Sequence, residues 1–273
     1  MTSLEDWVAR VEAHHEQSRR IQERSAWAPD ENGRYVASMF VVDPRRTDDA
    51  VLNRLLRAVS PTTTVLDVGG GAGRYALPLA LACKEVTVIE PDPGMVRALR
   101  EQIAQHRIAN ITVIEEKWQT ARVKPADIVL GAHVIYDVVE IREFVRWLTV
   151  HARELVLLLA NMPWRMQVLS AFWPPVHGEP RVTLPSVPEL LPLLWELGVF
   201  PNLEMLSVHP PESYVDRERL LAILRRMIYV KPGSEQDARL QSALDALTDK
   251  VPSGITLRDA VPLREALVLW SDE

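Results

Sequence analysis

Hydrophobic and polar positions change their spacing along the chain in a regular order. Residues 3–24 place Leu4, Trp7 and further apolar side chains on one side of a helix, because an α-helix repeats every 3.6 residues. Residues 48–59 show the same spacing and end before a Ser-Pro pair, which does not continue a helix. The pattern therefore predicts two helices, joined by a turn-rich segment at 26–47.

Short apolar runs then alternate with helical segments up to residue 160. Runs of Val, Ile and Leu without polar alternation indicate strands that are buried on both faces, as in a parallel sheet covered by helices. The expected strands are 64–68, 85–90, 111–116, 126–132 and 154–160, and the expected helices are 74–83, 93–106 and 140–152. This order predicts a doubly wound α/β fold.

The alternation breaks after residue 160. Residues 161–187 contain five prolines and predict a structured loop rather than a helix. The elements expected beyond it are a helix at 188–200, a strand at 202–208, two helices within 215–250 and a last strand at 263–270. Since no linker is visible, we predict one domain over 1–273. Its expected parts are an N-terminal helical cover (1–47), a cofactor-binding half (48–160) and a substrate-side half (161–273) with an insertion at about 212–261.

Composition fits a globular protein and narrows its partners. The chain has 273 residues, 47% hydrophobic and 25% charged, and needs no disulfide or metal to hold its core. Its net charge of −6 argues against a general nucleic-acid or membrane-surface binder, because such binding depends on positive charge. Cys83 is the single cysteine, so we expect no disulfide framework and no metal site. The sequence also lacks a signal peptide and a membrane-spanning run, which predicts a cytoplasmic location.

A glycine-rich loop carries the functional prediction. In the segment VLDVGGGAG at 65–73, Asp67 lies two residues before Gly69, the first of three alternate glycines. Glycine permits positive φ and a close approach of backbone to ligand. A dinucleotide-binding loop would need its third glycine at position 74, where Arg74 stands. An acid followed by alternate glycines fits the segment better.

This segment resembles the first motif of the class I S-adenosylmethionine-dependent methyltransferases, an acid followed by Gly-x-Gly-x-Gly. Their second motif is an acid at the end of strand two, and Glu90 matches it. A carboxylate there accepts hydrogen bonds from both ribose hydroxyls. The resemblance implies a seven-stranded, mostly parallel sheet with an antiparallel last strand, and S-adenosyl-L-methionine as the cofactor. The cofactor-binding residues it implies are Asp67, Gly69, Gly70, Gly71, Gly73, Glu90, Pro91, Met95, Lys117, Trp118, Ala132 and His133.

Three of these residues have alternative roles. Many relatives carry an acid and then alanine after strand three, whereas this chain has Lys117 and Trp118, which leaves the adenine contact open. His133 follows strand four beside the expected methyl group and is the first candidate for a catalytic base, ahead of Tyr136 and His177. His133 could equally be a hydrogen-bonded core residue, and Trp118 could simply pack on the sheet edge.

The sequence therefore predicts an S-adenosylmethionine-dependent methyltransferase whose acceptor is a small molecule of unspecified identity. An RNA or protein methyltransferase is the alternative, which the acidic charge disfavours. A non-catalytic S-adenosylmethionine-binding scaffold is a second alternative, which the intact motifs disfavour. The segments 1–47, 161–187 and 212–261 are expected to cover the substrate, because none of them looks able to bury a core alone. The oligomeric state is not indicated.

Overall fold

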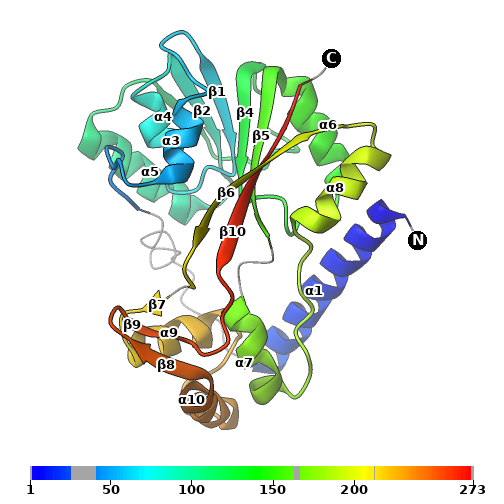
Figure 1. The fold of residues 1–273 in the computed structure, drawn as a ribbon, viewed down its shortest axis with the longest axis vertical. Helices are drawn as coiled ribbons and strands as arrows, with labels where there is room; N and C mark the ends of the chain where they lie inside the picture. Colours follow the sequence, from blue (N-terminus) through cyan, green and yellow to red (C-terminus); the bar gives the residue numbers. More distant parts are fainter. Residues whose placement is uncertain (1, 26–40, 163–166, 212, 272–273) are drawn as a thin grey trace. The chain divides into compact units, whose positions relative to one another are not determined.

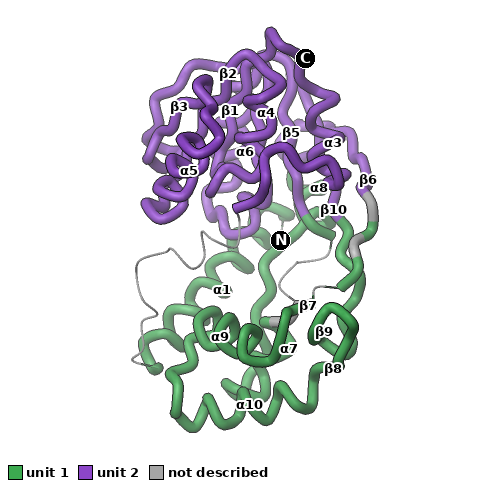
Figure 2. The backbone as a smooth tube through the Cα atoms, turned by 90° about the vertical axis from the view of Figure 1, so that its left-hand side faces the viewer, with its two compact units in different colours: residues 1–31, 161–193, 208–264 green, residues 32–160, 194–207, 265–273 purple. Residues whose placement is uncertain are grey.

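The structure is a computed structural model that describes residues 2–25, 41–162, 167–211 and 213–271. Most of the turn-rich segment predicted at 26–47 lies outside the described residues. The chain forms two compact units, coloured separately in Figure 2. Unit 1 consists of residues 1–31, 161–193 and 208–264, and unit 2 of residues 32–160, 194–207 and 265–273.

A seven-stranded sheet organises unit 2 (Figure 1), in the order β3-β2-β1-β4-β5-β10-β6. The strands are β1 (Thr64–Val68), β2 (Glu85–Ile89), β3 (Ile111–Ile114), β4 (Ala126–Ala132), β5 (Ala152–Met162), β6 (Asn202–His209) and β10 (Leu263–Trp270). The pairings among β1 to β5 are all parallel, and Figure 1 shows β10 running against β6. The predicted mostly parallel, seven-stranded sheet is confirmed. Its order reverses between β1 and β4, the position where such sheets bind ligands.

Helices cover both faces of this sheet. They are α3 (Ala50–Leu56), α4 (Ala76–Ala80), α5 (Pro93–His106) and α6 (Ile141–His151). One apolar cluster joins α3, α4 and α5 to alternate strand residues such as Leu130 and Leu157. The neighbouring residues Val129 and Leu158 are equally buried but lie outside that cluster, because successive side chains of a strand point to opposite faces of the sheet. The unbroken apolar runs of the sequence therefore reflect burial on both faces.

Unit 1 has a second hydrophobic core. Its helices are α1 (Ser3–Ser25), α7 (Gln167–His177), α9 (Arg217–Met227) and α10 (Glu235–Leu247), and α8 (Val187–Glu196) joins the residues of the two units. A three-stranded antiparallel sheet accompanies them, with β7 (Ser213–Tyr214), β9 (Gly254–Leu257) and β8 (Thr248–Val251). Fully buried side chains from α7, α9 and α10, including Trp173, Leu224 and Leu240, form the core.

One expectation for this half was wrong, because residues 167–177 form a helix although Pro174 and Pro175 lie within it. Burial of Phe172 and Trp173 outweighs the two missing N–H groups. The segments 1–47, 161–187 and 212–261, none of which was expected to bury a core alone, build one together, while one domain over 1–273 stays a prediction. The small sheet was missed because its strands are only two to four residues long.

Candidate functional site

The glycine loop leaves the carboxyl end of β1 in a left-handed backbone conformation. The φ angles of Gly69, Gly71 and Gly73 are +69°, +55° and +89°. The Gly69 N–H donates to the carbonyl of Ile89 at 2.7 Å, which ties the loop to the end of β2. Residues with a Cβ rarely adopt such angles. The alternate glycines therefore have the backbone role that the sequence predicts.

Gly73 also fixes how closely two helices approach the loop. A Cβ at this position would lie 2.6 Å from Leu99 Cδ1 in α5 and 2.9 Å from Leu77 Cγ in α4. The Gly73 carbonyl accepts a hydrogen bond from the Leu77 N–H at 3.1 Å. Both leucines belong to the buried core, so the loop and the helix packing depend on the same missing side chain.

Asp67 is a buried carboxylic acid with an unused oxygen. It lies in β1 between Val88 of β2 and Leu130 of β4, and only 2% of its surface is exposed. Its Oδ1 has no hydrogen-bond partner among the described residues. Burial, reinforced by the negative charge of Glu90, raises the pKa of Asp67 to about 7. A buried acceptor without a donor among the described residues is unusual, and an acid with a raised pKa in such a place is a candidate for a functional site.

Glu90 holds the loop from the end of β2. Its Oε2 accepts a hydrogen bond from the Gly71 N–H at 2.9 Å, and its Oε1 accepts one from the Asp92 N–H at 2.8 Å. Burial raises the pKa of Glu90, although these two N–H groups act in the opposite direction. Each carboxylate oxygen has a second lone pair, so both can still accept from a ligand.

The other residues predicted from the motifs lie beside the loop, at the surface or against α6. Met95 lies beside the loop, with its Sδ 4.0 Å from the position a Cβ of Gly71 would occupy. Pro91 and Lys117 are exposed. Trp118 packs its ring against Phe144 and Trp147 of α6, at centroid distances of 5.1 Å and 6.3 Å. The packing alternative considered for Trp118 thus describes its contacts, and an adenine contact stays a prediction.

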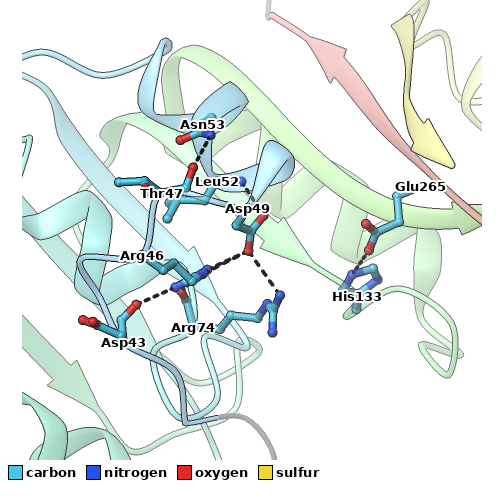
Figure 3. Close-up of polar contacts among 9 residues, drawn as sticks. All are labelled: Asp43, Arg46, Thr47, Asp49, Leu52, Asn53, Arg74, His133 and Glu265. Carbon is cyan, nitrogen blue, oxygen red and sulfur yellow. Dashed lines mark hydrogen bonds and ion pairs between the residues drawn. The ribbon is translucent and has the colours of Figure 1, made fainter. Parts of the chain in front are cut away.

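His133 follows Ala132, the last and half-buried residue of β4, and has an unusual φ of +60°. Its Nδ1 lies 2.9 Å from the Tyr136 hydroxyl. Its Nε2 lies 3.0 Å from Glu265 Oε1 in β10, the contact drawn in Figure 3. Both ring nitrogens are therefore engaged. The sequence analysis missed Glu265, although an acid inside the apolar run LREALVLW is a signal that could have indicated it.

A second polar group in unit 2 was also missed. Asp49 Oδ2 accepts hydrogen bonds from Arg46 Nε and Nη2 at 3.0 Å and from Arg74 Nη2 at 3.2 Å (Figure 3). Burial opposes ionisation of Asp49, but the Leu52 N–H and the two guanidiniums outweigh it and lower its pKa. Arg46 also donates to the Arg74 carbonyl at 3.1 Å, so this group fastens the start of α3 to the glycine loop.

Comparisons with known proteins agree with this geometry. Residues 65–155 match the family model described as "Methyltransferase domain". The YcgJ protein of Bacillus subtilis superimposes with a TM-score of 0.56 at 12% identity, covering 81% of this chain and 98% of that one. The BH2331 protein of Bacillus halodurans C-125 gives a TM-score of 0.54 at 13% identity, covering 81% and 96%. Residues 65–155 thus match a methyltransferase domain, and the two solved structures show that the chain shares their fold.

Curated relatives match over a shorter stretch. The chain is 37% identical over 71 residues to the "Probable ribosomal RNA small subunit methyltransferase A" of Methanosphaera stadtmanae. This stretch is 25% of the chain and 26% of that relative, so the chain matches about a quarter of the relative's length. Among the described residues, no helix is long and apolar enough to cross a membrane, and no three metal-ligating side chains form a group.

Gly73→Ala should destabilise the protein by about 2–4 kcal/mol, because it adds a clash with two core leucines to the strain of a positive φ. Gly198→Ala is the matched control, since φ is +78° there and nothing lies within 4 Å of the new methyl group. It should cost only about 1 kcal/mol. Urea unfolding measures both, and equal losses would show that the clash is relieved without cost.

Asp67→Asn should change how stability depends on pH. The unfolded acid loses its proton near pH 4 and the folded one near pH 7, so Asp67 lowers the free energy of unfolding progressively across this range. The variant lacks this loss, and its stability relative to the natural protein should rise by on the order of 3 kcal/mol from pH 4 to pH 8.

Asp127→Asn is the control for this measurement. Hydrogen bonds from Thr64 lower the pKa of Asp127, so its contribution to stability is lost as pH falls. Because that loss begins only below about pH 4, the difference for Asp127→Asn should stay nearly flat between pH 4 and pH 8, where the difference for Asp67→Asn changes. A flat difference for Asp67→Asn would mean that Asp67 ionises as freely in the folded state as in the unfolded state.

Proposed function

We propose that this protein transfers a methyl group from S-adenosyl-L-methionine to a small-molecule acceptor. The observation that carries the proposal is the pair of buried carboxylates, Asp67 and Glu90, at the ends of adjacent strands on either side of the glycine loop. The free Oδ1 of Asp67 suits a cationic or N–H-bearing group, and Glu90 suits the two ribose hydroxyls. S-adenosyl-L-methionine supplies a methyl group that is already activated by its sulfonium.

The acceptor is the finer part of the proposal. The net charge of −6 supports a small molecule, because RNA binding depends on neutralising phosphates. RNA is the second candidate, since the curated relatives are named as ribosomal RNA methyltransferases. A methyl-transfer screen with labelled donor, run over small metabolites and over ribosomal RNA, distinguishes the two. Incorporation into RNA alone would overturn the small-molecule acceptor, and a cytoplasmic location stays a prediction of the sequence.

The main work of the chain would be to orient the reactants and exclude water, because the methyl group needs no further activation. A proton must leave only when the acceptor atom carries one. His133 was the first candidate to take it, yet both of its nitrogens are bonded within the protein. The tautomer that satisfies both contacts donates from Nε2 to Glu265 and accepts at Nδ1 from the Tyr136 hydroxyl.

This arrangement gives Tyr136 the position next to the acceptor in the proposed path. The phenol oxygen would take the acceptor's proton while its own proton passes to His133 Nδ1. The Glu265 carboxylate would stabilise the imidazolium that results. Tyr136 and His133 would then act as one relay, with Glu265 as a positioning residue.

Glu90→Ala should weaken binding of S-adenosyl-L-methionine by about 2–4 kcal/mol, since it removes a charged acceptor of two hydrogen bonds. Glu115→Gln is the control, because Glu115 is an exposed acid after β3 that pairs with Arg100. Calorimetry should find its affinity unchanged. Unchanged affinity in a folded Glu90→Ala protein would show that the ribose binds elsewhere.

Tyr136→Phe and His133→Asn should each retain donor affinity and lose about 10²–10⁴-fold in turnover, because each interrupts the relay. Glu265→Gln should keep more activity and shift the pH–rate profile, since it removes only the charge beside the imidazole. Single-turnover kinetics across pH would measure all three once an acceptor is known. Should Tyr136→Phe keep full activity while His133→Asn loses it, His133 meets the acceptor directly and the relay is wrong.

A further inference from the structure

Arg181, just after α7 in unit 1, is a partly buried cation held by neutral groups. Its Nη1 donates to Gln17 Oε1 at 2.8 Å, and its Nη2 lies 2.7 Å from both His14 Nε2 and Ser18 Oγ. The guanidinium carbon lies 3.9 Å from the centre of the Trp173 ring. These contacts fix the guanidinium in place, and none of these partners carries a negative charge.

The described neighbours of Arg181 offset its charge only in part: Glu179 raises the pKa of Arg181 but forms its ion pair with Arg20. His14 Nδ1 donates to the Val182 carbonyl at 2.6 Å, which leaves a neutral Nε2 to accept from Arg181, and burial lowers the pKa of His14 to about 4. Glu179 is bound by Arg20 at 2.6 Å and 2.8 Å. Among the described residues, no carboxylate lies within ion-pair distance of Arg181, and burial lowers its pKa to about 10. A desolvated cation without an anion is costly.

Unused hydrogen-bond donors lie on the helix beside it. Ser170 Oγ and Trp173 Nε1, one turn apart on α7, are buried and have no partner among the described residues. The guanidinium has five N–H groups, of which the contacts with described residues occupy three. A ligand that suits this set must be rich in hydrogen-bond acceptors and negatively charged.

We propose that unit 1 contains an anion-binding site in which Arg181 takes a carboxylate or phosphate group of a ligand. Arginine suits this role because its charge is permanent, and because the Nε–H and one Nη1–H of this guanidinium, held over an indole, have no acceptor among the described residues. The site is formed by α1, α7 and the segment after α7, and none of its residues belongs to the glycine loop or the carboxylate pair of unit 2. It therefore does not depend on the proposed methyl transfer.

NMR titration of the natural full-length protein tests the site directly. The probes are inorganic phosphate and acetate, with chloride at equal ionic strength as the reference. Both the Arg181 Nε–H and the Trp173 indole N–H resonances should shift with saturation at millimolar probe, and the probe that binds more tightly tells phosphate from carboxylate ligands. Arg181→Lys and Trp173→Phe assign the two resonances.

Arg181→Gln should abolish the saturable shift at Trp173. Arg19→Gln is the matched control, because it removes the same charge from an exposed position on α1, where Arg19 pairs with Glu16 and Glu23. It should leave both shifts intact. If the natural protein shows only the linear drift that chloride also produces, or if the Trp173 shift persists in Arg181→Gln, there is no anion site and Arg181 only fastens α1 to the segment after α7. The titration of the natural protein decides the matter even if Arg181→Gln does not fold.

Discussion

The buried pair of carboxylates at the ends of β1 and β2 is the constraint on which the ligand edge of unit 2 depends. Burial raises the pKa of both acids, and the negative charge of Glu90 raises that of Asp67 further. Glu90 offsets this effect in part with two backbone N–H groups, one of them from the glycine loop. Asp67 has no such partner at Oδ1 among the described residues. One acid is thus satisfied by the backbone, and we propose that the other accepts from a ligand.

The glycine loop makes this arrangement possible, because it turns the backbone back toward Glu90. Gly71 must adopt a positive φ to present its N–H, and Gly73 must lack a side chain for α4 and α5 to pack behind it. Arg46, Asp49 and Arg74 then fix the outer side of the loop. The backbone conformation of the loop, the packing of α4 and α5 and the ion pairs of Asp49 therefore all involve residues in or beside the glycine loop.

Much of unit 2 could be predicted from sequence, and much of unit 1 could not. Parallel strands buried on both faces leave continuous apolar runs, and the acid-glycine motif lies in one uninterrupted segment. In contrast, α7 is helical despite its two prolines, because Phe172 and Trp173 pack into a core with residues of α9 and α10. Those two helices are distant from α7 in the sequence. His133 and Glu265 likewise lie far apart in the sequence. The acid inside the apolar run could indicate Glu265, but not the residue that it contacts.

The protonation of Asp67 offers the most direct test of the account. If Asp67 waits for a cationic ligand with a pKa of about 7, binding of S-adenosyl-L-methionine at pH 6 must expel its proton. Calorimetric titrations in two buffers of different ionisation enthalpy measure that release. The account predicts binding with net proton release at pH 6 that fades by pH 8. Absence of binding, or binding heats that are independent of the buffer at pH 6, would contradict it.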